Sequence, residues 1–257
     1  MTQQNIIYAF SEPNIQAAIL NHFQKHLSDT FSRDNPEKQI ANNLSNLHEL
    51  FLKNNLKPGD PDQKDLLLKK GTDQKTLLHR SIYSSFDDEN FLSSDFYRAY
   101  YQLCNTILET LKTSTGIKKE WAVQRFPTIR FHFPQNISVF EFHRDSDYGH
   151  PIGEINCFYA INECNETSAL QVEKDLGLEN YAPLNLQPGQ YALLNTSTFR
   201  HGDKLNTSET TRVSMDFRFI PIENLGNIAG GSLSANKKFS ADDYFIKETD
   251  RTAPIRR

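Results

Sequence analysis

The feature that most constrains this chain is a series of short segments after Trp121 in which β-branched and aromatic residues alternate with polar ones. Such alternation is typical of strands that bury one face. Turn-forming residues such as Pro134 and Pro188-Gly189 separate the segments, and this pattern favours an antiparallel sandwich or barrel. The predicted strands are TIRFHF (128–133), SVFEFH (138–143), EINCFYAI (154–161), ALQVE (169–173), QYALLN (190–195) and TRVSMDFRFI (211–220).

The region before residue 117 has helical periodicity instead. Apolar residues recur every three or four positions over 12–31, 36–52 and 94–113, which places them on one face of a helix. Helices followed by strands predict an α+β protein with N-terminal helices packed against one β-core. We therefore expect a single domain over 1–257. Its predicted parts are a mainly helical 1–117, a β-core at 118–222 and a loop-rich tail at 223–257 that could act as a lid.

Composition limits the kinds of partner. The 257 residues carry a net charge of -4 without a basic block, which disfavours nucleic-acid binding. No run of 18 apolar residues and no secretory leader pattern is present, so we expect neither a membrane span nor export. Three cysteines without CxxC spacing argue against a disulfide framework. These features predict a cytoplasmic protein that binds a small molecule, and they leave its oligomeric state open.

Ligand-type side chains are crowded in the segment FEFHRDSDYGH at 140–150. His143 and Asp145 lie two positions apart at the end of a predicted strand, so they share a face. A third ligand could come from His201, at the head of the last strong strand region. Two imidazoles and one carboxylate form a ligand set for Fe(II) that leaves coordination positions open. We predict that these three residues bind a catalytic metal, with open positions for a cosubstrate and O2.

A possible cosubstrate site follows His201 along the chain. Arg212 and Ser214 lie two positions apart on one predicted strand and therefore point to the same side. A guanidinium and a hydroxyl suit the distal carboxylate of a dicarboxylic acid such as 2-oxoglutarate. The 2-oxo-acid end would then bind the metal, which predicts oxidative decarboxylation coupled to oxidation of a C–H bond.

These motifs together resemble those of a known family, the iron(II)/2-oxoglutarate-dependent oxygenases. Its HxD, distal His and RxS order is matched by 143–145, His201 and 212–214. The segments at 124–156 and 211–221 are similar to the StrG-type subgroup associated with streptomycin biosynthesis, and the likeness covers roughly 121–222. The resemblance implies a double-stranded β-helix, a jelly-roll or cupin-like core, and a hydroxylase or related activity. Related halogenases replace the carboxylate ligand with Gly or Ala, so Asp145 favours hydroxylation.

Further polar residues lie close to these ligands in the sequence. Asp147 and His150 are candidates for substrate contact. Alternatively, His150 could orient a metal ligand, or both side chains could form hydrogen bonds with the backbone of their own loop. Glu154 and Asn156 share one face of a strand, where inward polar groups need partners. This favours contact with substrate or cosubstrate slightly over a structural hydrogen-bond network.

Three more residues belong to the predicted site. Asp216 and Arg218 lie on the same strand face as Arg212. There they are expected either to form a structural ion pair or to bind a charged group of the substrate. Gln124 precedes the core strands and is a candidate for contact with 2-oxoglutarate.

The favoured function is an Fe(II)/2-oxoglutarate-dependent dioxygenase that hydroxylates a small polar metabolite, either an amino acid or a sugar or aminoglycoside-type intermediate. One alternative is a cupin-like hydrolase or isomerase in which Zn2+ activates water, which needs neither Arg212 nor 2-oxoglutarate. Another is a non-catalytic β-sandwich that binds carbohydrate or protein. That alternative predicts that the two histidines and Asp145 lie far apart.

Overall fold

The computed structural model of the chain describes residues 3–31, 43–49, 77–86, 93–116, 120–138, 142–225, 231–232, 237–240 and 243–250. The helices in these ranges are α1 (Pro13–Phe31), α5 (Leu77–Ser84) and α6 (Asp95–Thr115), with short 3-10 turns η1 (Leu44–Asn46), η3 (Asp145–Tyr148) and η4 (Ile222–Leu225). The strands are β1 (Ile7–Phe10), β2 (Trp121–Gln124), β3 (Thr128–His132), β4 (Ile155–Ala160), β5 (Gln171–Glu173), β6 (Tyr181–Pro183), β7 (Gln190–Leu194), β8 (His201–Gly202), β9 (Arg212–Pro221), β10 (Gly231–Ser232), β11 (Lys237–Lys238) and β12 (Phe245–Lys247).

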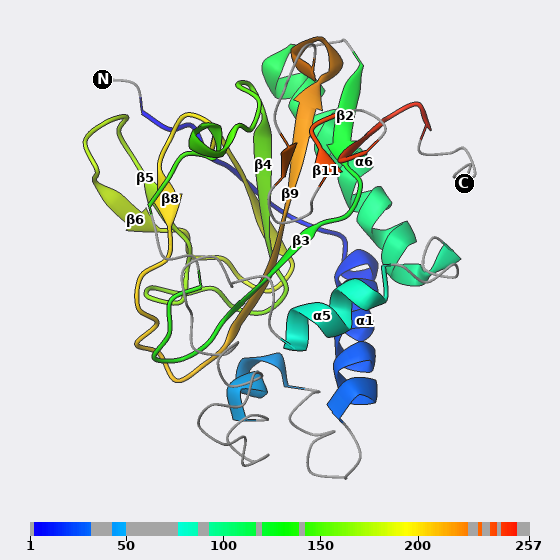
Figure 1. Cartoon of the computed structure of the whole chain (residues 1–257), viewed down its shortest axis with the longest axis vertical. Helices are drawn as coiled ribbons and strands as arrows, with labels where there is room; N and C mark the ends of the chain where they lie inside the picture. Colours follow the sequence, from blue (N-terminus) through cyan, green and yellow to red (C-terminus); the bar gives the residue numbers. More distant parts are fainter. Residues whose placement is uncertain are drawn as a thin grey trace.

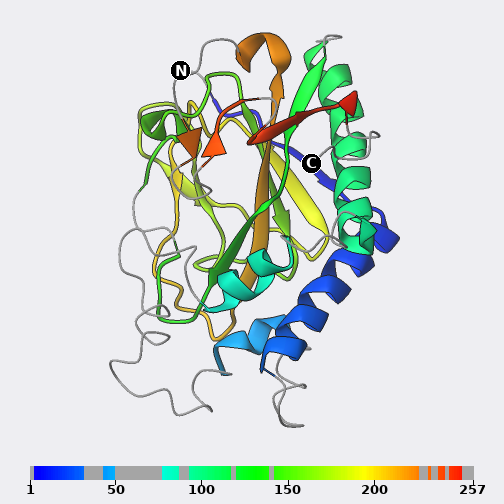
Figure 2. The ribbon, with the colours of Figure 1, turned by 45° about the vertical axis from the view of Figure 1, so that its right-hand side comes forward.

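The strands form antiparallel sheets, and with the helices they make an α+β protein. A seven-stranded sheet has the order β1-β7-β4-β9-β2-β12, and β3 also pairs with β9. A three-stranded sheet has the order β6-β5-β8, and β10 pairs with β11. Figure 1 shows α1 and α6 on one side of the large sheet and the small sheet on the other. The turned view in Figure 2 shows the same two helices along that side.

Strand β9 has an apolar face that packs against the helices and a polar face on the opposite side of the large sheet. All ten of its residues are buried, so both faces of the strand are covered. The apolar residues Val213, Met215, Phe217 and Phe219 belong to the core that the helices share, and the Tyr100 ring of α6 meets Phe217 edge-on at 5.1 Å. Because side chains alternate along a strand, the polar residues between them face the opposite side. This is the side on which the site is built.

A second apolar cluster joins the large sheet to the small one. Phe158 of β4 and Ala192 of β7 pack in one cluster with Val172 of β5. Their sequence neighbours Tyr159 and Tyr191 belong to the helix-side core instead, as alternation along each strand requires. At this cluster, the side of the large sheet that faces away from the helices is covered by the small sheet.

The helices predicted over 12–31 and 94–113 are present as α1 and α6. Helix α6 begins after Ser94, whose hydroxyl accepts a hydrogen bond from the Tyr97 amide at 3.1 Å, an ordinary N-cap. It ends at Gly116, whose φ of 67° is the left-handed conformation that glycine adopts easily. The helix predicted over 36–52 lies mostly outside the described residues, within which 44–46 form η1.

Several short strands differ from the sequence-based expectations. The region expected to be mainly helical contributes β1, which pairs with β7 at the edge of the large sheet. The tail expected to be loop-rich contributes β12, which pairs with β2 at the other edge. Of the strand predicted over 138–143, residues 139–141 lie outside the described ranges. Within the described ranges, no helix has the length and apolar character to cross a membrane.

Candidate functional site

The two predicted histidine ligands are brought together by their own backbone. His143 and His201 form an isolated antiparallel bridge, in which each amide donates to the carbonyl of the other, at 3.0 and 2.9 Å. Directly opposed residues in such a bridge send their side chains to the same face. The two imidazole rings accordingly lie with their centroids 4.5 Å apart.

Asp145 completes the group from the first residue of η3. Its Oδ1 lies 3.6 Å from Nε2 of His143 and 3.6 Å from Nε2 of His201, and one ligand atom from each residue falls within 4.8 Å of the others. The amide of Asp145 donates to the Thr196 carbonyl at 2.8 Å. Two imidazole nitrogens and one carboxylate oxygen therefore converge on one buried point, a donor set suited to Fe(II).

Charge states in the group also suit a metal. Burial raises the pKa of Asp145, but Arg218 and His201 outweigh it and hold that pKa well below its usual range. Burial lowers the pKa of His201 to about 4, although Asp145 opposes the change. The carboxylate is therefore ionised and the His201 imidazole neutral at neutral pH, which are the forms that ligate metals.

Arg218 is the centre of a buried ion-pair network beside this group. Its side chain contacts Asp145 Oδ2 at 3.1 Å, Glu154 Oε1 at 2.9 Å and Asp216 Oδ2 at 2.9 Å. Asp216 is also bound by Arg130 Nε at 2.9 Å. The structure thus places Asp216 and Arg218 in an ion pair, one of the two arrangements expected for them.

A second group of ligand-type atoms overlaps the first. Asp145, His150 and Glu154 also lie close enough to bind one ion, and His150 Nδ1 is 3.1 Å from Glu154 Oε1. However, Arg218 already contacts both carboxylates, so a cation of the chain itself neutralises them. Burial raises the pKa of Glu154, with His150 and Arg218 opposing that change. We therefore assign this group to the ion-pair network rather than to a second metal.

Arg212 is fully buried and already has a partner. Its terminal nitrogens donate to both oxygens of Asp203, at 2.9 and 3.1 Å, and one of them also reaches Ser138 Oγ at 3.4 Å. Arg212 Nε and Ser214 Oγ are buried without a hydrogen-bond partner. The pair predicted to hold 2-oxoglutarate thus keeps two unused polar atoms, while the fork of the guanidinium is occupied by Asp203.

A small cavity lies beside Arg212 and the two histidine ligands, and neither Ser214 nor Asp145 is among the residues that line it. It is lined by both histidine ligands, by Asp203 and Arg212, and by Asn156. Its volume is about 30 Å³, far below the roughly 300–1,000 Å³ of typical small-molecule pockets. The Oδ1 atom of Asn156 is buried there without a partner, so this residue remains available to a ligand.

Two other predicted residues have partners within the protein. Gln124 does not line the cavity; its amide nitrogen donates to Phe126 O at 2.6 Å and its oxygen accepts from Arg218 at 3.3 Å. Asp147 accepts a hydrogen bond from the Arg144 amide at 2.9 Å, and so stabilises the start of its own 3-10 turn. The structure therefore gives both side chains local partners, which leaves their predicted ligand roles without direct support.

Sequence reasoning missed two residues of the site. Asp203 lies two positions after His201, a spacing that could have suggested a shared face had β8 been anticipated. Thr196 donates from Oγ1 to Asp145 Oδ2 at 2.7 Å across 51 sequence positions. Nothing in the local sequence around Thr196 signals this contact.

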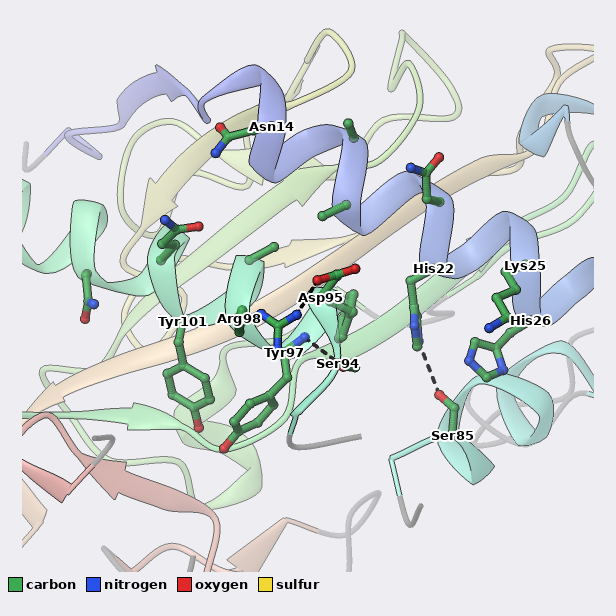
Figure 3. Close-up of a pocket in the computed structure, with 17 residues that line it drawn as sticks. Asn14, His22, Lys25, His26, Ser85, Ser94, Asp95, Tyr97, Arg98 and Tyr101 are labelled. Carbon is green, nitrogen blue, oxygen red and sulfur yellow. Dashed lines mark hydrogen bonds and ion pairs between the residues drawn. The ribbon is translucent and has the colours of Figure 1, made fainter. Parts of the chain in front are cut away.

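A much larger pocket of about 1250 Å³ lies between α1 and α6 (Figure 3). There the His22 ring stacks on Phe96, 4.4 Å between centroids, and Asp95 pairs with Arg98. Burial and the nearby His26 and Lys25 lower the pKa of His22 to about 3. The two ligand groups found among the described residues both lie elsewhere, so size alone does not make this pocket the site.

Comparison with known proteins places the chain near one curated relative. No family model matches it. Over 182 residues it is 26% identical to the streptomycin biosynthesis protein StrG of Streptomyces griseus, a match that covers 70% of this chain and 81% of that protein. The chain is therefore similar to StrG, as the segments at 124–156 and 211–221 predicted.

Solved structures give a weaker likeness. The non-heme monooxygenase ThoJ in its nickel complex aligns with 85% of this chain and 74% of its own, at a TM-score of 0.42 and 11% identity. EctD from S. alaskensis with bound Fe aligns with 86% of this chain and 74% of its own, at a TM-score of 0.43 and 11% identity. Likeness of this degree is too weak to transfer fold or function.

Proposed function

We propose that the protein is an Fe(II)/2-oxoglutarate-dependent dioxygenase that hydroxylates a C–H bond of a small polar metabolite. The observation that carries this proposal is the convergence of His143, Asp145 and His201 within 4.8 Å, because His201 comes from a part of the sequence far from the other two residues. The facing antiparallel sheets support a double-stranded β-helix core. Three free, buried cysteines support a cytoplasmic location, and we treat 1–257 as one oxygenase domain.

The chain's residues fit this metal in number and chemistry. His143, Asp145 and His201 would hold Fe(II), which with 2-oxoglutarate and O2 supplies the oxidant for the C–H bond while the cosubstrate is decarboxylated to succinate. The protein keeps Asp145 ionised through Arg218 and keeps His201 neutral through burial. These residues thus prepare the ligand set before any metal arrives.

Arg212 and Ser214 are the proposed holders of the distal carboxylate of 2-oxoglutarate. The cavity of about 30 Å³ is too small for a dicarboxylic acid, and Asp203 occupies the fork of Arg212. We therefore expect the distal carboxylate to exchange with Asp203, and the Ser214 hydroxyl to gain the partner that it lacks.

The substrate class remains broad. Asn156 has a buried oxygen without a hydrogen-bond partner in the cavity, and Tyr148, a residue that is 46% exposed, packs edge-on against His143 at 5.0 Å between ring centroids. Both can contact a polar molecule near the metal. The similarity to a protein of streptomycin biosynthesis supports a sugar or aminoglycoside-type intermediate, with an amino acid as the other class.

Succinate release on admission of O2 tests the proposal. Protein loaded anaerobically with Fe(II) and 2-oxoglutarate should show a weak visible charge-transfer band and should release succinate with a panel of amino acids and sugars. Asp145→Ala should abolish both, because a metal ligand is lost. Asp95→Ala, which removes an exposed carboxylate on α6, should leave both unchanged. Normal succinate release by Asp145→Ala would overturn the proposal.

A second candidate has one observation in its favour. Because Asp203 neutralises Arg212 in this structure, the same metal ligands could serve a Zn2+-dependent hydrolase or isomerase that needs no dicarboxylate. That enzyme would show no charge-transfer band with 2-oxoglutarate and would work without O2. Activity of Zn2+-loaded protein under anaerobic conditions would favour this candidate.

A further inference from the structure

The two carboxylate oxygens of Asp145 have different surroundings. Oδ1 faces the histidines, 3.6 Å from Nε2 of each. Oδ2 points away from them and accepts hydrogen bonds from Thr196 Oγ1 at 2.7 Å and from Arg218 at 3.1 Å. Asp145 is only 3% exposed, so these two donors, rather than bulk water, determine which oxygen faces the ligand set.

Both donors are held in place by other contacts. The Arg218 guanidinium also contacts Asp216 at 2.9 Å and Glu154 at 2.9 Å, and both carboxylates are buried. Turning Arg218 away from Asp145 would therefore break several charge-assisted contacts at once. Thr196 is held by its carbonyl, which accepts the Asp145 amide at 2.8 Å.

We propose that Arg218 and Thr196 are positioning residues that occupy Oδ2 of Asp145 and so present Oδ1 alone to the metal. This inference rests on the proposed Fe(II) site. A carboxylate that binds through one oxygen takes one coordination position, and with two imidazoles it leaves three of six open. A cosubstrate that binds through two oxygens and O2 together need all three. Binding through both carboxylate oxygens would leave one position too few.

Fe(II) affinity, measured without cosubstrate by anaerobic calorimetric titration, tests the role of the hydroxyl. Thr196→Val removes the donor but keeps the side-chain shape, and we expect an affinity loss of about tenfold, the lower end for partners of metal ligands. Thr196→Ser keeps the hydroxyl and should bind nearly as the wild type does. Thr211→Val is the matched control: Thr211 is also buried, and its hydroxyl lies 2.9 Å from His48 Nδ1. This control should not change Fe(II) affinity.

Arg218→Lys tests the guanidinium. It keeps the positive charge but loses the fork that reaches Asp145, Glu154 and Asp216 together, and we expect a loss of Fe(II) affinity of about tenfold or more. Because the residue neutralises buried carboxylates, urea denaturation must first establish that the variant folds. If Arg218→Lys does not fold, the inference is tested with Thr196→Val alone.

An infrared difference spectrum reports the binding mode itself. The aspartate carboxyl carbons are isotopically labelled, and the spectrum of the metal-free protein is subtracted from that of the Fe(II)-bound protein. A carboxylate bound through one oxygen separates its two stretching bands widely, and one bound through both oxygens brings them together. Wild type should show the wide separation, and Thr196→Val and Arg218→Lys the narrow one. A role limited to overall stability would not move these bands.

Two results would overturn the inference while leaving the Fe(II) site intact. One is Fe(II) binding by wild type with a narrow band separation. The other is wild-type affinity and wide separation in folded Thr196→Val. Wild-type protein that binds no Fe(II) at all would instead refute the proposed function, and this inference with it.

Discussion

At the level of single residues, Arg212 and Asp203 form a buried ion pair at the position proposed for the distal carboxylate of 2-oxoglutarate. Both side chains are 1% exposed, and they share two hydrogen bonds. Burial raises the pKa of Asp203, but Arg212 and His132 outweigh it, so the pKa lies below its usual value and the pair stays ionised. Asp203 is thus an internal competitor for the position assigned to 2-oxoglutarate.

Replacing Asp203 should therefore favour the cosubstrate. Asp203→Asn removes the competing charge with little change of shape, and we expect 2-oxoglutarate to bind roughly tenfold more tightly, a change of about 1.4 kcal/mol. Arg212→Lys should bind it more weakly, because the fork is lost. Equilibrium titration of anaerobic, Fe(II)-loaded protein measures both. Weaker binding by Asp203→Asn would mean that Asp203 orients Arg212 instead of competing with the ligand.

That His143, Asp145 and His201 lie together could be predicted from the sequence, whereas the contacts that hold Asp145 in place could not. His143 and Asp145 lie two positions apart, and alternation along an extended segment puts them on one face. By contrast, Thr196 reaches Asp145 across 51 positions and Arg218 reaches it across 73. Such contacts depend on which strands become neighbours, and side-chain periodicity does not contain that information.

At the level of elements, long periodic segments were predictable and short edge strands were not. The pattern over 211–220 anticipates β9, whose alternation separates the helix-side core from the site. Strand β1 has only four residues, all of them apolar, although Tyr8 and Phe10 are exposed, so its sequence lacks the alternation of apolar and polar residues that marks a strand with one buried face. Strands β8 and β12 have two and three residues. Their pairing partners, rather than local propensity, make them strands.

At the level of the whole molecule, buried neutral histidines link stability to pH. His79 on α5 is fully buried, and burial, followed by the nearby Arg130, lowers its pKa to about 3, although a backbone hydrogen bond to Ile129 opposes this. In the unfolded chain this pKa is about 6.5. Between these values the unfolded chain binds more protons, so the free energy of unfolding falls as the pH drops below about 6.5.

The size of this effect can be measured with one variant. The His79 contribution falls by about 1.4 kcal/mol per pH unit below about 6.5, or about 2 kcal/mol between pH 7 and pH 5. The His79→Gln variant has no such titration. Between pH 7 and pH 5 its free energy of unfolding should therefore drop by about 2 kcal/mol less than that of the wild type. Urea denaturation of both proteins at the two pH values tests this. An equal drop in the free energy of unfolding of both proteins would show that His79 takes up a proton in the folded protein as readily as in the unfolded chain.

The central claim is that one Fe(II) ion binds between His143, Asp145 and His201. The most direct measurement is a crystal structure of protein loaded anaerobically with Fe(II), with diffraction data collected on both sides of the iron absorption edge. We predict one strong anomalous peak in contact with Nε2 of both histidines and Oδ1 of Asp145. Absence of the peak there, or a peak beside His150 and Glu154 instead, would contradict the account.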